Sequence, residues 1–110
     1  AVDEARFAQV VNKMRETSEI KLDTSNIPGI VKMASSSFGI TEPEGDGILQ
    51  HLIEGKDYTL YGLANAVTRY SQDVESYDRA SKLEEIGYSV LTMSPELFHT
   101  INSHVMSKAA

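Results

Sequence analysis

An amphipathic segment at residues 59–70 constrains the fold most, because its residues divide into two faces at helical spacing. At about 100° per residue, its apolar side chains and that of Val74 fall on one narrow stripe. The stripe consists of Leu60, Leu63, Ala64, Val67 and Val74. A helix of this kind buries its apolar stripe against other elements, so Leu63 and Val67 are predicted to be core residues. The opposite side carries Gly62, Asn65, Arg69 and Gln72.

Apolar spacing and helix-end signals predict helices along most of the chain. The central helix is expected over residues 59–74, with Thr59 as its N-cap. Five further helices are expected over residues 3–21, 27–38, 48–54, 76–86 and 94–105. Gly39, Gly55 and Gly87 are expected to end three of them, because glycine readily adopts the conformation that follows a helix.

Two segments interrupt this pattern. Residues 41–47 hold one of three prolines and two of seven glycines, so a loop is predicted there. Residues 88–93 are rich in β-formers, but a lone strand has no partner, so an extended loop or irregular helix is expected. The chain is therefore predicted to be all-α: a compact bundle of about five to six short helices, irregular rather than up-down. Without a repeat or a linker, residues 1–110 are expected to form a single helical domain.

Composition excludes several classes of protein. With 41% hydrophobic residues the chain is too apolar to be intrinsically disordered, and no run approaches the ~20 apolar residues that span a bilayer. A net charge of −6 opposes non-specific binding to a phosphate backbone. The absence of cysteine removes disulfides, thiolate nucleophiles and zinc ribbons, which fits a reducing cytoplasm. Because the chain begins with Ala rather than Met, we expect a fragment, the C-terminal part of a larger protein.

No metal or cofactor site is expected. No two of the three histidines, His51, His99 and His104, stand one helical turn apart. Glu96 and His99 have the Glu-x-x-His spacing of di-iron bundles, but no second copy exists. The acidic residues of the 41–47 loop alternate like calcium ligands, yet the twelfth position counted from Glu42 is Ile53 rather than Glu.

Catalysis is not expected either, although a remainder of the full-length protein could contribute an active site. No Gly-x-Ser-x-Gly elbow and no glycine-rich phosphate loop occurs in the sequence. The adjacent carboxylates Glu84 and Glu85 are typical of a solvent-facing helix side rather than of a glycosidase pair.

The polar side of the central helix is the one candidate site. Asn65 and Arg69 are one turn apart, and Gly62 and Gln72 extend the same stripe. This side is either a solvated face, a helix–helix contact in which Gly62 admits a neighbour, or a recognition face. In a recognition face, an amide and a guanidinium hydrogen-bond a partner. The candidate partner-binding residues are Asn65, Thr68, Arg69 and Gln72.

Two motifs carry a family resemblance. Tyr61-Gly-Leu-Ala-Asn-Ala-Val-Thr68 is followed after a short gap by Tyr77-Asp-Arg-Ala-Ser-Lys-Leu-Glu84. Together they resemble the C-terminal part of the phage/plasmid-like protein family of unknown function, number nine hundred and thirty-two in the domain-of-unknown-function series. The resemblance covers residues 56–90 and implies a phage, prophage or plasmid source. Asn65 and Thr68 match positions of the first motif, and Arg69 adjoins them. The sequence departs from the family where residues 87–91 precede the last expected helix.

The expected function is therefore that of a non-enzymatic helical interaction or assembly domain of a phage- or plasmid-encoded cytoplasmic protein. A protein partner or self-association is expected, and membrane binding is not. The alternative is an accessory domain of a nucleic-acid transaction protein, of the single-strand annealing or recombination type. In that case the full-length protein would contact the nucleic acid, since the acidic charge of this chain opposes it.

Overall fold

The computed structural model describes residues 2–92, without the side chains of residues 2, 3, 10, 13 and 14. This part of the chain forms five α-helices and one 3-10 turn, with no strand beyond an isolated antiparallel bridge between Lys21 and Thr59. The elements are α1 (Val2–Glu19), η1 (Thr24–Asn26), α2 (Ile27–Phe38), α3 (Glu42–Gly55), α4 (Leu60–Ser71) and α5 (Tyr77–Leu91). The predicted all-α class and the number of helices are confirmed. The helix predicted over residues 94–105 lies outside the described residues.

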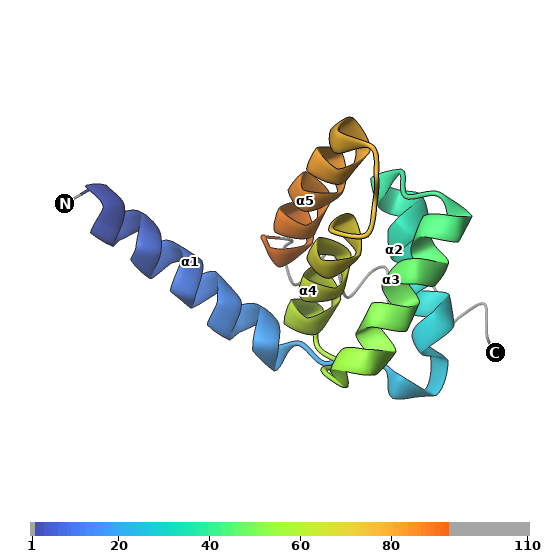
Figure 1. The fold of residues 1–110 in the computed structure, drawn as a ribbon. Coiled ribbons are helices and arrows are strands. Elements are labelled where there is room, and N and C mark those ends of the chain that lie inside the picture. The colour runs from blue at the N-terminus through green and yellow to red at the C-terminus, as the bar shows by residue number, and fades with distance from the viewer. Residues whose placement is uncertain (1, 93–110) are drawn as a thin grey trace.

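Helix α1 projects from the group formed by the other four helices, so the arrangement is not an up-down bundle (Figure 1). Only the C-terminal end of α1 is fixed to them. Thr17 is buried there. The segment that follows pairs with the start of α4, because Leu60 N–H donates to Ile20 O at 2.8 Å and Leu22 N–H donates to Tyr58 O at 2.9 Å.

The core is centred on α4, which packs against α5, α3 and α1. The predicted apolar stripe is confirmed: Leu60, Leu63, Ala64 and Val67 are buried, and Val74 is half-buried beyond the end of the helix. Gly62 is also buried, although it lies on the side predicted to be polar. A Cβ at Gly62 would collide with the backbone carbonyl of Asp57. Gly62 therefore admits a close neighbour, but that neighbour is the preceding loop rather than the second helix that the helix–helix alternative expected.

Most helix ends follow the predicted signals. Gly39 ends α2 in the left-handed conformation with φ 71°, as expected for a glycine that follows a helix. Thr59 caps α4 through its Oγ1, which accepts a hydrogen bond from Gly62 N–H at 3.0 Å. Ser76 caps α5 in the same way through Arg79 N–H at 3.4 Å.

The loop predicted over residues 41–47 is wrong, because α3 already begins at Glu42. Thr41 and Glu44 form a reciprocal capping box that starts the helix, and Pro43 is tolerated in the first turn, where its missing N–H is not needed. The helix accepts Gly45 because the Ser35 side chain packs against it, with Oγ 3.0 Å from where a Cβ would stand. The prediction that Gly55 caps this helix is also wrong: Lys56, at φ 56°, takes the left-handed position.

Two other predicted boundaries are wrong. Helix α5 does not end at Gly87 but continues to Leu91, so residues 88–91 belong to a regular α-helix rather than to the extended loop or irregular helix that was expected. Gly87 is buried against α4, where a Cβ would stand 2.7 Å from Thr68 Oγ1 and 3.3 Å from Ala64 O. The glycine therefore serves close helix packing rather than helix termination. Helix α4 ends at Ser71 rather than Val74, since the N–H of Gln72 turns back to Arg69 O.

Candidate functional site

A hollow of about 240 Å³ lies on the surface between α4 and α5, and we call it the α4–α5 hollow. It is lined by Ala64, Asn65, Thr68, Glu84, Gly87, Tyr88 and Leu91. Tyr88 is 58% exposed and Leu91 is half-buried, so apolar surface remains open to solvent there. Because Gly87 has no side chain, α5 packs close to α4 there, and no side chain of residue 87 fills the hollow.

Polar groups in the hollow are few and differ in availability. The hydroxyl of Thr68 is engaged, because its Oγ1 donates to Ala64 O at 3.1 Å. The half-buried Asn65 amide receives no side-chain hydrogen bond from residues 2–92. Glu84 adds an exposed carboxylate. The hollow therefore offers apolar contact, one amide that both donates and accepts, and one negative charge.

The other two predicted site residues lie elsewhere. Arg69 extends over the end of α3, where its Nη2 donates to His51 O at 3.3 Å. A Cβ at Gly55 would stand 2.5 Å from that nitrogen, so the glycine leaves room for the guanidinium. Gln72 is the C-cap of α4. Asn65 and Thr68 thus meet in the hollow, whereas Arg69 and Gln72 do not line it.

His51 ties α3 to the turn after α4. Its Nε2 lies 2.6 Å from Asp73 Oδ2, and its ring meets the edge of the Tyr70 ring at a centroid distance of 6.4 Å. Asp73 is 59% exposed. In the part of the chain that is described, no serine or threonine hydroxyl hydrogen-bonds this imidazole, so the pair does not form a nucleophilic triad.

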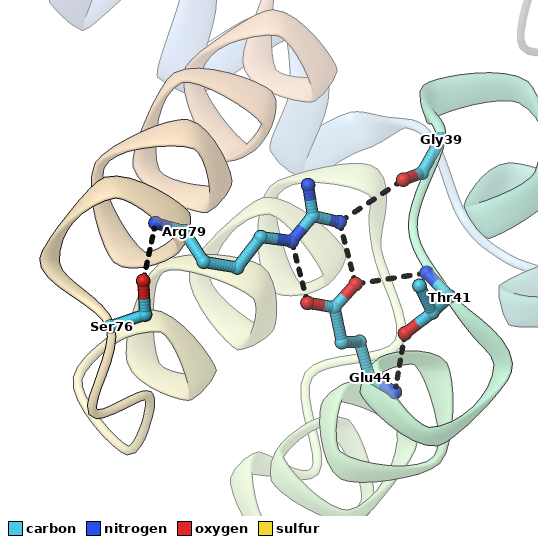
Figure 2. Close-up of polar contacts among 5 residues, drawn as sticks. All are labelled: Gly39, Thr41, Glu44, Ser76 and Arg79. Carbon is cyan, nitrogen blue, oxygen red and sulfur yellow. Dashed lines mark hydrogen bonds and ion pairs between the residues drawn. The ribbon is translucent and has the colours of Figure 1, made fainter.

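The strongest polar cluster joins the starts of α3 and α5 (Figure 2). Arg79 Nε donates to Glu44 Oε2 and Arg79 Nη2 to Glu44 Oε1, both at 2.6 Å, and Nη2 also donates to Gly39 O at 3.0 Å. Glu44 Oε1 in turn accepts from Thr41 N–H at 2.9 Å. These bonds connect the α2–α3 turn with α5.

The Arg79 hydrogen bonds, with smaller contributions from those of Thr41, lower the pKa of Glu44 from 4.5 to about 2, against the opposing effect of burial. The same contact raises the pKa of the Arg79 guanidinium. Both carboxylate oxygens of Glu44 are occupied, so the cluster stabilises the fold rather than presenting groups to a ligand. The sequence prediction missed it by placing Glu44 in a loop, although the spacing Thr41-x-x-Glu44 is that of a capping box.

Within residues 2–92, no group of three or more His, Asp or Glu side chains is placed to hold a metal ion. None of the described helices combines the length and the apolar character that crossing a bilayer requires.

Comparison with known proteins found no matching family model, no matching curated protein and no matching solved structure. The resemblance to the phage/plasmid-like family therefore stays a prediction that rests on the two motifs alone.

Proposed function

We propose that this chain is a non-enzymatic interaction domain that binds a partner protein in the α4–α5 hollow. One observation carries the proposal: the two motifs of the family resemblance converge there. Asn65 and Thr68 come from the first motif and Glu84 from the second, and all three line the hollow. Through that resemblance we also propose that the domain belongs to a phage- or plasmid-encoded protein.

The chemistry of the hollow supports a protein rather than a small molecule as its occupant. Its volume of about 240 Å³ is below the ~300–1,000 Å³ of ordinary ligand pockets. It offers the half-open apolar surface of Tyr88 and Leu91, beside an amide that lacks a side-chain partner among residues 2–92. We expect an apolar side chain of the partner to contact Tyr88 and Leu91. A polar group of the partner would hydrogen-bond Asn65, and a basic residue would pair with Glu84. Aromatic anchors such as Tyr88 are common at the energetic centres of interfaces.

The test compares proteins captured from host lysate by the immobilised chain and by matched variants. Tyr88→Ala and Asn65→Ala remove the anchor and the amide. Tyr77→Ala is the control, because Tyr77 is 82% exposed on the same helix but does not line the hollow. We expect one protein to be retained by the parent chain and the control and lost by the other two variants, at unchanged melting temperature.

Retention that is indifferent to both hollow substitutions contradicts the proposal. The nucleic-acid alternative is measured on the same proteins by titrating single-stranded DNA. Binding at about 50 mM salt that falls steeply as salt rises would favour that alternative, because phosphate contacts release counterions. Absence of such binding by both this chain and the full-length protein excludes it.

A further inference from the structure

The N-terminal half of α1 is exposed without a neighbour among the described residues. Residues 4–9 are all exposed, and the large apolar side chain of Phe7 is 72% exposed. Val11 is half-buried, and Thr17 is the first fully buried residue among the side chains of α1 that the structure describes. Isolated helices shorter than about 12–15 residues are marginal in water, so a projecting half-helix gains stability from packing against another molecule.

The charges along α1 are self-complementary. Glu4 and Arg15 are both exposed and lie eleven residues apart. At 3.6 residues per turn they are therefore about 20° apart around the helix and about 16 Å apart along it. Val11 and Phe7 lie about 20° and about 60° to one side of Glu4. One side of α1 thus carries a negative charge at its start, a positive charge near its end and apolar residues beside them.

A two-fold axis that passes midway between Glu4 and Arg15 places opposite charges of two α1 helices beside each other. In an antiparallel pair of α1 helices, Glu4 of each chain faces Arg15 of the second copy, and the contact forms twice. Phe7 of each chain then lies near Val11 of the second copy. A parallel pair would instead face Glu4 with Glu4 and Arg15 with Arg15. Because α1 projects from the other helices, the two bundles would stand at opposite ends of the pair (Figure 1).

We propose that α1 is a self-association surface on which a second copy of this chain docks its own α1 in the antiparallel direction. This inference goes beyond the proposed function, since the surface is distinct from the α4–α5 hollow and the two are tested by different variants. A dimer would present two hollows to partner proteins.

Sedimentation over a concentration series measures the association directly. We expect a monomer–dimer equilibrium that Glu4→Arg or Arg15→Glu weakens by roughly tenfold, because each change replaces two exposed ion pairs by two repulsions. The double variant Glu4→Arg/Arg15→Glu restores the pairing in the reverse sense and should return affinity to within about threefold of the parent. Phe7→Ser should weaken the dimer at least as much as either single reversal.

The control is Glu54→Arg, an exposed position on α3 with the same change in net charge as Glu4→Arg. It and Tyr88→Ala should leave the dimer unchanged, which separates this surface from the hollow. A chain that stays monomeric up to about 1 mM, the affinity at which association is weak, overturns the inference. A dimer whose affinity is unchanged by the single charge reversals also overturns the inference, and so does a double variant that fails to restore the affinity. Circular dichroism of each variant verifies that the helices are intact.

Discussion

Removal of the Arg79 guanidinium should cost the fold roughly 1.5–3 kcal/mol, the usual cost of losing hydrogen bonds to a charged group. Arg79→Ala deletes two hydrogen bonds to Glu44 and one to Gly39 O. The pKa of Glu44 is lowered from 4.5 to about 2 in the folded chain. At about 1.4 kcal/mol per unit of pKa, this shift corresponds to roughly 3 kcal/mol of folding free energy. The Arg79 side chain is 31% exposed. Screening by solvent therefore makes the contribution of the ion pair to stability smaller than this value of roughly 3 kcal/mol.

The stability that the Arg79–Glu44 pair contributes depends on pH in a defined direction. Because the folded-state pKa of Glu44 is lowered, the unfolded chain takes up the proton first as pH falls. The stabilisation by Arg79 is therefore complete above about pH 4.5 and disappears as pH falls towards 2. Urea unfolding followed by far-ultraviolet circular dichroism, at pH 7 and at steps down to the lowest pH at which the chain folds, measures the difference between parent and variant.

Arg79→Lys and Glu44→Gln complete the experiment. Lysine keeps the charge but cannot form the two-pronged contact, so it should recover only part of the lost stability. The double variant Glu44→Gln/Arg79→Ala should be less destabilised than the sum of the single changes, because the two residues interact. Equal stability of Arg79→Ala and the parent at pH 7 would refute the reasoning. A difference that persists unchanged to pH 2 would refute the assignment to Glu44.

Three further predictions use the same unfolding assay. Leu63→Ala should cost about 2–5 kcal/mol, since Leu63 is 3% exposed at the centre of the core; a cost below about 1 kcal/mol would contradict its placement. Gly62→Ala should cost at least about 1–3 kcal/mol, because its Cβ meets the Asp57 carbonyl; an unchanged melting temperature would show that the loop yields freely. Arg69→Ala should cost under about 0.5 kcal/mol, because its exposed guanidinium makes one 3.3 Å hydrogen bond to His51 O; a loss of several kcal/mol would reveal a buried ion pair.

The central helix was predictable because its signals are local. A threonine cap and an apolar stripe at helical spacing lie within residues 59–70, and both hold in the structure. The start of α3 was missed because one proline and two glycines were read as loop formers. The helix accommodates all three residues: Pro43 lies in the first turn, Gly45 packs against Ser35 of α2, and Gly47 faces the Tyr70 ring of α4.

The candidate site was predictable only in part, for a related reason. Asn65 and Thr68 were identified from one helix face and one motif. Glu84, Tyr88 and Leu91 join them only through the packing of α5 on α4, which no local periodicity encodes. Gly87 was the available signal: a glycine inside a helix costs about 1 kcal/mol relative to alanine, so its presence indicates a close contact. The prediction treated it as a helix end instead.

Besides its buried apolar face, helix α5 makes two contacts with distinct roles, one for stability and one beside the hollow. Arg79 ties its first turns to Glu44 at the start of α3, and Gly87 seats its second half on Ala64 and Thr68. The two positions are eight residues, or about 12 Å, apart along the helix. Loss of Arg79 should lower the melting temperature while the hollow keeps its shape in every folded molecule. Arg79→Ala should therefore retain the partner protein well below its own melting temperature, whereas Tyr88→Ala should lose the partner without melting earlier. If Arg79→Ala also lost the partner at temperatures where the variant is fully folded, the shape of the hollow would depend on the start of α5 as well. The binding site would then extend over the whole helix.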